Sequence, residues 1–239
     1  MKRYSKEFTL STEEQRSPGW FKERAGIPSA SGLGFLFDTL KDGYTPSAKA
    51  KKYLKQLAFE REFGTTFENF QTKAMRDGVF YEDFAKEVYV KETGNTLIEA
   101  YSYVSDWFIA TPDSNVVEEK TKDTGLLECK IVGDATFMEM IEEGMPIEHE
   151  LQTQSQLMAS GDDWVDYIVV NLKTRAYFIQ RVKRNNKLIK RIYERLHEPL
   201  DLPTLKDIGV KRFDEGALQE YMGEGSSQDE DLTIGDLPF

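Results

Sequence analysis

One short segment limits how this chain can fold: residues 126–132 (LLECKIV) are apolar except for Glu128 and Lys130. Alternate side chains of a β-strand point to opposite faces of a sheet, so these two charged residues share one face. A strand this apolar belongs inside a domain, where an ionised group is unfavourable unless it is paired or binds a cation. The segment therefore predicts a central strand that carries a buried and ionised face.

The hydrophobic pattern around this strand changes between helical and strand spacing along the chain. Helical spacing predicts helices over residues 20–40 (two, separated by a turn), 49–63, 80–93, 136–143, 148–158 and 213–222, and a basic amphipathic helix within 181–197. Strand signals cover residues 96–100, 108–111, 116–117, 126–131, 164–171 and 175–182. This order predicts an α/β fold with a central mixed sheet flanked by helices.

A second acidic residue is placed to meet Glu128. Asp113 follows Pro112 at a predicted strand end, fifteen residues before Glu128. That separation is the span of a β-hairpin, so the two carboxylates are expected to converge at the sheet edge. Glu82, on the predicted helix 80–93, is a third acid for the same place. Carboxylates without a histidine or cysteine cluster suit Mg²⁺ or Mn²⁺.

Lys130 and the backbone carbonyl of Cys129 complete this candidate metal site. The lysine would orient an attacking water or neutralise a phosphate group, and the carbonyl would be a further ligand. On spacing alone an alternative stays open, because a Pro-Asp turn is common and a Glu-x-Lys pair on a strand is often an exposed salt bridge.

The charge of the chain is unevenly distributed. With 31 basic and 42 acidic residues the net charge is −11, which at first argues against a nucleic-acid partner. Residues 224–239 contain five acids and no base, whereas residues 181–195 contain seven bases and one acid. A second basic cluster lies at 49–55. Each basic cluster is either a solvated helix face or a binding surface, so the net charge excludes little.

Domain organisation and location follow from the remaining composition. A single domain over residues 1–223 and an acidic, flexible tail over 224–239 are expected. The lone cysteine fits a reducing compartment. The sequence contains neither a membrane-length apolar run nor a signal-peptide pattern, so a cytoplasmic protein is expected.

Five motifs occur in a fixed order between residues 20 and 182. They are WFKERAGIPSAS (20–31), GxxYExxAxxxYxxxTG (78–94), ATPD (110–113), LECK (127–130) and LQTQSQLM (151–158). Together they resemble the phage lambda exonuclease family of viral recombination nucleases, in the PD-(D/E)-x-K superfamily. The resemblance implies a restriction-endonuclease-like core.

The resemblance also implies roles for individual residues. Asp113, Glu128 and Glu82 would hold the metal, and Lys130 would be the catalytic lysine. Gln154 matches a glutamine near the metal and the scissile phosphate, and its neighbour Gln152 would bind the DNA. Arg24 and Ser31 match positions that hold a 5′-terminal phosphate, and Thr111 lies where a small hydroxyl residue assists.

Other roles stay open for several of these side chains. Arg24 could form an ordinary salt bridge, Ser31 could only cap a helix, Glu82 could face solvent, and Gln154 could pack in the interior. One departure from the family pattern is Tyr103, which stands ten residues before Asp113 where a second acid can occur.

The function implied by the resemblance is a Mg²⁺-dependent 5′→3′ exonuclease. It would digest one strand of linear double-stranded DNA to mononucleotides and leave a 3′ single strand for a phage single-strand annealing protein. The family implies a homotrimer in the cytoplasm of a bacterial host. The alternatives are another PD-(D/E)-x-K nuclease, such as an endonuclease or a repair nuclease, and a non-catalytic DNA-binding recombination adaptor.

The end of the chain carries a separate signal. Acidic residues followed by Asp236, Leu237, Pro238 and Phe239 resemble the C-terminal tip of bacterial single-stranded-DNA-binding proteins. Such a tip offers a flexible acidic lead and an aromatic anchor to basic, apolar pockets. The tail is therefore expected to bind host proteins that recognise such tips. The alternatives are a generic acidic tail and a segment that competes with DNA for the basic clusters.

Overall fold

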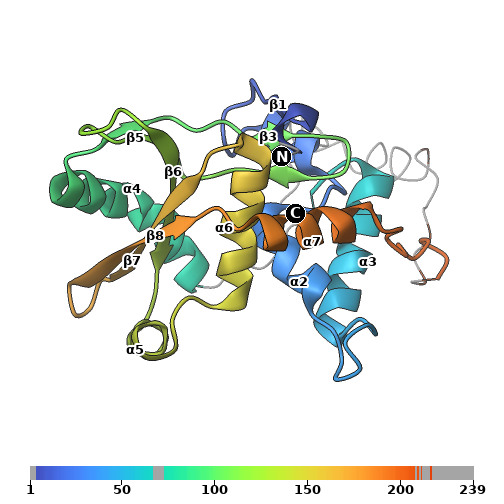
Figure 1. Ribbon diagram of the computed structural model, residues 1–239. Helices are drawn as coiled ribbons and strands as arrows, with labels where there is room; N and C mark the ends of the chain where they lie inside the picture. The colour runs from blue at the N-terminus through green and yellow to red at the C-terminus, as the bar shows by residue number, and fades with distance from the viewer. Residues whose placement is uncertain (1–3, 67–72, 208, 210, 212–215, 217–239) are drawn as a thin grey trace, which may run out of the picture. The chain divides into compact units, whose positions relative to one another are not determined.

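A computed structural model describes residues 4–66, 73–207, 209, 211 and 216 (Figure 1). The α-helices are α1 (Pro18–Arg24), α2 (Leu33–Phe37), α3 (Ala48–Phe63), α4 (Lys73–Thr93), α5 (Asp134–Glu143), α6 (Ile147–Ser160) and α7 (Asn186–His197). The strands are β1 (Thr9–Leu10), β2 (Thr96–Ile98), β3 (Tyr103–Val104), β4 (Ile109–Ala110), β5 (Ser114–Val117), β6 (Thr124–Ile131), β7 (Trp164–Asn171) and β8 (Ala176–Lys183). Two short 3₁₀ helices are η1 (Tyr4–Glu7) and η2 (Ala30–Gly32).

The principal sheet is mixed, as the sequence predicts. Its strand order is β2-β5-β6-β7-β8, in which β6 and β7 are parallel and the other neighbours are antiparallel. The short strands β1, β3 and β4 form a second, three-stranded sheet. Strand β6, which holds the charged pair, therefore lies in the middle of the principal sheet.

Helices cover both faces of the principal sheet (Figure 1). On one face Leu127 of β6 packs in a cluster with Ala85 and Tyr89 of α4. On the other face Leu126 packs with Leu151 and other apolar residues of α6. A strand covered on both faces is expected to be apolar at successive positions, which is the pattern that the sequence of β6 has.

Local signals position the helices that carry functional side chains. The hydroxyl of Ser47 accepts hydrogen bonds from the backbone N–H groups of Lys49 and Ala50, so it caps the N-terminus of α3. Helix α4 is followed by Gly94 at φ +71°, a left-handed conformation that favours glycine. The predicted stop of this helix is confirmed.

Several predicted boundaries differ from the structure. Helix α4 begins at Lys73 rather than at residue 80, and the predicted strand 108–111 belongs to the small sheet. The basic segment 181–197 is divided, because residues 181–183 end β8 and only residues from Asn186 are helical. Residues 181–183 pair with β7 and are therefore extended, although their spacing also fits a helix.

The chain divides into two units, Met1–Leu202 and Pro203–Phe239, and the first contains every helix and strand named above. The predicted boundary after residue 223, most of the predicted helix 213–222 and the acidic tail lie outside the described residues. Within residues 4–66 and 73–207, none of the helices combines the length and apolar composition that crossing a bilayer requires.

Candidate active site

The β5–β6 hairpin brings the two predicted metal-binding acids together. Ser114 pairs with Leu127, and one further step in this antiparallel register sets Asp113 opposite Glu128. The backbone N–H of Asp113 donates to the carbonyl of Leu127 (3.1 Å). The Asp113 carboxylate accepts a hydrogen bond from the backbone N–H of Cys129 (2.6 Å). The convergence expected from the fifteen-residue spacing is present at the end of β5.

The Glu128 carboxylate is buried against α6 and fully hydrogen-bonded. Its side chain is 3% exposed. Oε1 accepts from Lys130 Nζ and from Gln152 Nε2, both at 2.6 Å, and Oε2 accepts from Gln156 Nε2 at 2.6 Å. Lys130 Nζ also donates to Gln152 Oε1 (3.1 Å). The Glu-x-Lys pair is therefore an interior cluster, and the alternative of an exposed salt bridge is wrong.

The local charges crowd Asp113. Burial raises the pKa of its carboxyl well above the ordinary value, and the nearby carboxylates of Glu128 and Glu82 raise it further. Burial acts to lower the pKa of Lys130, but Glu128 and Asp113 outweigh this effect and raise it. The site therefore holds an ammonium group among carboxylates whose mutual repulsion a bound cation would relieve.

Glu82 reaches this site from the other face of the sheet. It lies on α4, and its carboxylate forms ion pairs with Arg16 (2.9 Å) and Lys86 (2.7 Å). Its side chain is 16% exposed, so it is not a solvent-facing helix residue. Within the described residues, no three His, Cys, Asp or Glu side chains are grouped as a metal site. Asp113 and Glu128 are therefore the adjacent pair of carboxylates, and Glu82 stays a predicted third acid that acts directly or through water.

The donor set at this pair fits a hard cation. The N–H and C=O of one strand residue point to the same strand edge, so the carbonyl of Cys129 points to the side from which Asp113 accepts its N–H. Gln156 is buried, and its Oε1 has no hydrogen-bond partner among the described residues. Carboxylate, carbonyl and amide oxygens are the donors that Mg²⁺ and Mn²⁺ prefer.

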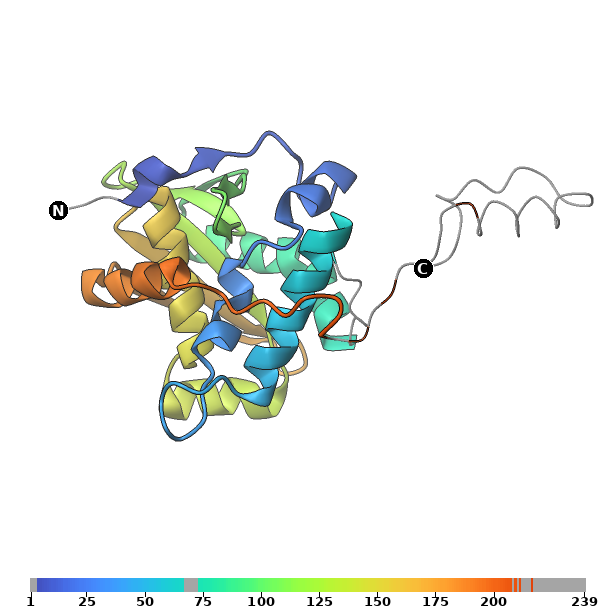
Figure 2. The same cartoon turned by 90° about the vertical axis from the view of Figure 1, so that its right-hand side faces the viewer.

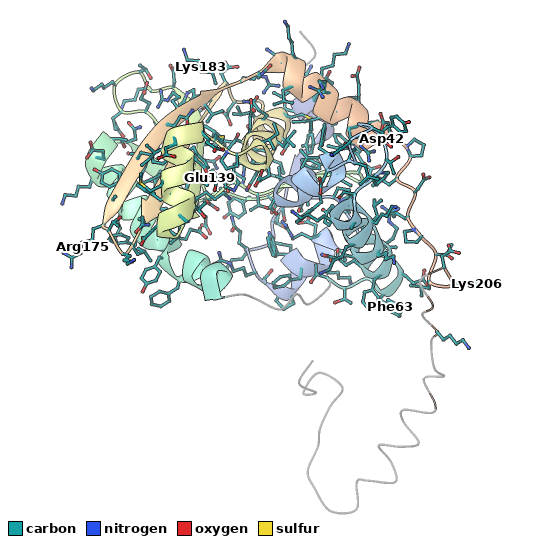
Figure 3. The ribbon with its side chains drawn as sticks, turned by 90° about the horizontal axis from the view of Figure 1, so that it is seen from below. Asp42, Phe63, Glu139, Arg175, Lys183 and Lys206 are labelled. Carbon is teal, nitrogen blue, oxygen red and sulfur yellow. The ribbon has the colours of Figure 1, made fainter. Side chains whose placement is uncertain are left out.

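On helix α6 it is Gln156, and not the predicted Gln154, that contacts Glu128. Gln154 Nε2 donates to the carbonyl of Lys183 (2.8 Å; Lys183 is labelled in Figure 3), and Gln154 Oε1 accepts from the backbone N–H of Asn185 (2.7 Å). Gln154 therefore holds the connection between β8 and α7. Gln152 and Gln156 are four residues apart and share the face toward Glu128. That spacing was the signal that could have identified Gln156.

A second feature is a pocket of about 220 Å³, and Arg24 is the one predicted phosphate-binding residue among those that line it. Arg24 contributes to its wall, stacks over Trp20 (4.1 Å from guanidinium carbon to ring centre) and donates to the hydroxyl of Thr111 (3.2 Å). Ser29 also lines the pocket, and its hydroxyl lies 3.3 Å from that of Ser31. Ser29 is the residue that caps η2, so a capping role for Ser31 is wrong.

Two residues outside the predicted set join this pocket to the carboxylates. The buried hydroxyl of Ser102 accepts from Trp20 Nε1 (3.0 Å) and lies 2.6 Å from the hydroxyl of Thr111. Gln156 Nε2 contacts the carbonyl of Thr111 (3.4 Å) as well as Glu128. A chain of polar contacts thus runs from Arg24 to Glu128. Nothing in the sequence around Ser102 distinguishes it from a surface serine.

His149 lies on α6 near Lys130 and Glu128, and it is held in its neutral form. Its Nδ1 lies 2.7 Å from the hydroxyl of Tyr167, and burial, with the charge of Lys130, lowers its pKa to about 4. An unfolded histidine titrates near pH 6.5, so protonation favours the unfolded state. The stabilisation by neutral His149 is complete above pH 6.5 and is lost as the pH falls toward 4.

We therefore expect the free energy of unfolding of His149→Gln to fall less steeply below pH 7 than that of the wild type. Between pH 7 and pH 4.5 the wild type should lose about 2 kcal/mol more free energy of unfolding than the variant. Urea unfolding at the two pH values measures this difference, with His197→Gln on α7 as the control. Equal losses in wild type and His149→Gln would contradict the prediction.

The chain is similar to several proteins of known structure. The chain is similar to an alkaline exonuclease (LHK-Exo) from Laribacter hongkongensis, with a TM-score of 0.64 and 26% identity over 89% of this chain and 99% of that one. The structure of LHK-Exo in complex with dAMP matches with a TM-score of 0.65 and the same identity and coverage. A phage-related exonuclease from Haemophilus somnus 129PT, 16% identical with a TM-score of 0.53 over 71% of this chain and 90% of that one, shares the fold.

No curated protein matches the chain. The model of the YqaJ-like viral recombinase domain matches residues 19–163, which include Arg24, Asp113, Glu128, Lys130 and Gln156. The lambda-exonuclease-like resemblance seen in the sequence and the PD-(D/E)-x-K type of fold are thereby confirmed. The chain belongs to the family of YqaJ-like viral recombinase domains.

Proposed function

We propose that this protein is a Mg²⁺-dependent exonuclease that digests one strand of linear double-stranded DNA from its 5′ end. The observation that carries the proposal is the continuous polar connection between the Arg24 pocket and the Asp113–Glu128–Lys130 cluster. A pocket that contains an arginine, next to a cluster suited to phosphodiester hydrolysis, fits a strand-end nuclease. Membership of a viral recombinase family and similarity to alkaline exonucleases support the same function.

The phosphate pocket would determine where cleavage begins. Arg24 offers a planar guanidinium fixed by Trp20 and Thr111, and such a group binds phosphate through two parallel hydrogen bonds. The hydroxyls of Ser31 and Thr111 would add further donors. A strand end whose 5′-phosphate occupies this pocket would present its first internucleotide linkage to the neighbouring cluster.

The cluster would perform the hydrolysis. Asp113, Glu128 and the Cys129 carbonyl would hold Mg²⁺, or Mn²⁺ in its place. The bound ion would make a water molecule more acidic and offset charge on the phosphate. Lys130 would donate hydrogen bonds to the water or to the scissile phosphate, and Gln152 and Gln156 would keep the Glu128 carboxylate in position. Glu82, with Lys86 and Arg16, would complete the charge balance on the α4 side.

The assembly proposed for this activity follows the family resemblance. A homotrimer would surround the duplex in the cytoplasm of a bacterial host, and the 3′ strand would pass to a phage single-strand annealing protein. Asp236, Leu237, Pro238 and Phe239 would recruit host proteins that bind the tips of single-stranded-DNA-binding proteins.

The proposal is tested with 5′-phosphorylated linear duplex labelled at one end or the other. With Mg²⁺ we expect mononucleotides to appear first from the 5′ ends, and a covalently closed circle of the same sequence to stay intact. Cleavage of the circle would assign the protein to the endonucleases of the superfamily instead. Absence of any nucleotide release with Mg²⁺ or Mn²⁺ would contradict the proposed activity and favour a non-catalytic DNA-binding adaptor.

Arg24→Ala should remove the preference for a 5′-phosphate. Losing a charge-assisted hydrogen bond costs about 1.5–3 kcal/mol, so the ratio of initial rates on 5′-phosphorylated and 5′-hydroxyl duplex should fall by about 10- to 100-fold. Arg175→Ala, in the exposed turn between β7 and β8 (labelled in Figure 3), is the control and should keep the wild-type ratio. A ratio in Arg24→Ala equal to that of wild type would remove Arg24 from the phosphate pocket.

A further inference from the structure

Helix α3 has two faces of opposite character. Its inner face is buried in the core through Ala50, Tyr53, Leu54 and Leu57. Its outer face exposes four lysines, Lys49, Lys51, Lys52 and Lys55, which we call the lysine face. Figure 2 shows α3, in light blue to cyan, on the side of the first unit that is turned to the viewer, and Figure 3 labels Phe63 at its C-terminal end.

The lysine face is unfavourable for the helix itself. Lys49 and Lys51 lie in the first turn, where the helix dipole disfavours positive charge. Lys51 and Lys55 are four residues apart, and like charges at this spacing repel each other. None of the ion pairs among the described residues includes a lysine of this face. Helix stability therefore does not account for these charges in a chain of net charge −11.

The same helix forms a wall of the Arg24 pocket. Tyr53, Gln56, Leu57 and Glu60 of α3 line this pocket together with Arg24. Lys52 lies one helical turn before Gln56 and shares its side of the helix. The lysine face thus begins next to the pocket in which a strand end would be held, and continues along α3 toward its N-terminus.

We propose that the lysine face binds the sugar–phosphate backbone of the duplex beside the strand end. From Lys49 to Lys55 the helix rises by about 9 Å, at roughly 1.5 Å per residue. A strand of B-DNA advances about 3.4 Å per phosphate along its axis, so two to three phosphates pass over this length. Four lysine ammonium groups are enough to pair with each of these phosphates. This inference rests on the proposed function, because it takes duplex DNA as the substrate.

The test replaces three lysines and measures binding without catalysis. The variant Lys51→Gln/Lys52→Gln/Lys55→Gln is compared with wild type in EDTA, using 5′-phosphorylated duplex at 50–200 mM NaCl. The logarithm of the association constant falls linearly with the logarithm of the salt concentration. Each lost phosphate contact makes this slope less steep by about 0.9, so its magnitude should decrease by up to about 2.7. The thermal midpoint of unfolding should stay the same or rise, because repulsion within α3 is reduced.

Two further variants isolate the cause. Replacing the same three lysines with arginine keeps the charge and should keep the wild-type slope. Lys120→Gln/Lys122→Gln/Lys173→Gln removes equal charge from the β5–β6 and β7–β8 turns and should also leave the slope near wild type.

The outcomes separate this inference from the proposed function. Suppose that wild type binds and digests duplex, but that the variant with three α3 lysines replaced has the same salt slope as the Lys120/Lys122/Lys173 variant. The lysine face is then not a DNA-binding surface. If the α3 variant binds duplex normally but loses binding to poly-glutamate, the face belongs to an acidic protein partner, and the inference is again wrong. A wild type that neither binds nor digests duplex would instead contradict the proposed function.

Discussion

Replacing Lys130 with alanine is expected to slow strand hydrolysis by about 10³-fold and to leave the affinity for duplex DNA within a few fold of wild type. Lys130 Nζ lies 2.6 Å from Glu128 Oε1 and 3.1 Å from Gln152 Oε1, in the middle of the hydrolytic cluster. It is an ammonium group held in place before any substrate binds. Such fixed donors act most strongly on charge that develops during the reaction.

The structure also explains why this variant should fold. After removal of the ammonium group, Glu128 still accepts hydrogen bonds from Gln152 and Gln156. The carboxylate is therefore not left without partners in the interior. Lys130→Ala should keep a cooperative unfolding transition, so lost activity can be assigned to lost chemistry.

The measurement is the single-turnover rate on end-labelled duplex at saturating enzyme and Mg²⁺. Lys173→Ala is the control, because Lys173 is exposed, pairs with Asp134 and lies in the β7–β8 turn. Lys130→Arg keeps the charge and should recover part of the rate. Activity of Lys130→Ala within threefold of wild type would show that the assigned cluster is not the hydrolytic site.

The second large effect is on stability, at Asp166 in the centre of the principal sheet. This residue is 3% exposed, and its carboxylate accepts from Arg181 Nε (2.8 Å), from Arg181 Nη2 (2.9 Å) and from the hydroxyl of Tyr89 (2.6 Å). Asn95 donates to the same tyrosine hydroxyl (2.9 Å). Burial and the hydrogen bond to Asp166 raise the pKa of Tyr89, so the phenol remains a donor.

Asp166→Ala should lower the free energy of unfolding by about 3–5 kcal/mol, because it leaves a tyrosine hydroxyl and part of a guanidinium without their acceptor. Urea unfolding measures the change. Asp134→Ala is the matched control, since Asp134 pairs with Lys173 on the exposed surface, and it should have little effect. A loss in Asp166→Ala no greater than in this control would mean that the network does not stabilise the fold.

This network also bears on the site. Tyr89 and Glu82 are seven residues apart, two turns of α4, and so lie on similar sides of the helix. The hydrogen bond from Tyr89 to Asp166 holds α4 against β7 and thereby fixes the position of Glu82 relative to the principal sheet. The sequence contained both residues but offered no sign that they would meet.

Much of the fold was predictable because it depends on local patterns. The apolar run of β6, the alternation that puts Glu128 and Lys130 on one face, and the helix stop before Gly94 each arise within a few residues. The Asp113–Glu128 hairpin is a medium-range feature with clear strand signals on both sides. The two-residue strands β1 and β3 were missed because so short a segment has no periodicity.

The sequence by itself determined which chemical groups the site contains: two carboxylates and a lysine on a buried hairpin, and an arginine near small hydroxyl residues. Only the tertiary structure decided how they are partnered. It set Gln156 rather than Gln154 against Glu128, paired Glu82 with Arg16, and used Ser102 to join Trp20 to Thr111. The reason is that a strand's period specifies its faces from the sequence, whereas the face that a helix turns to a given strand depends on packing between distant segments.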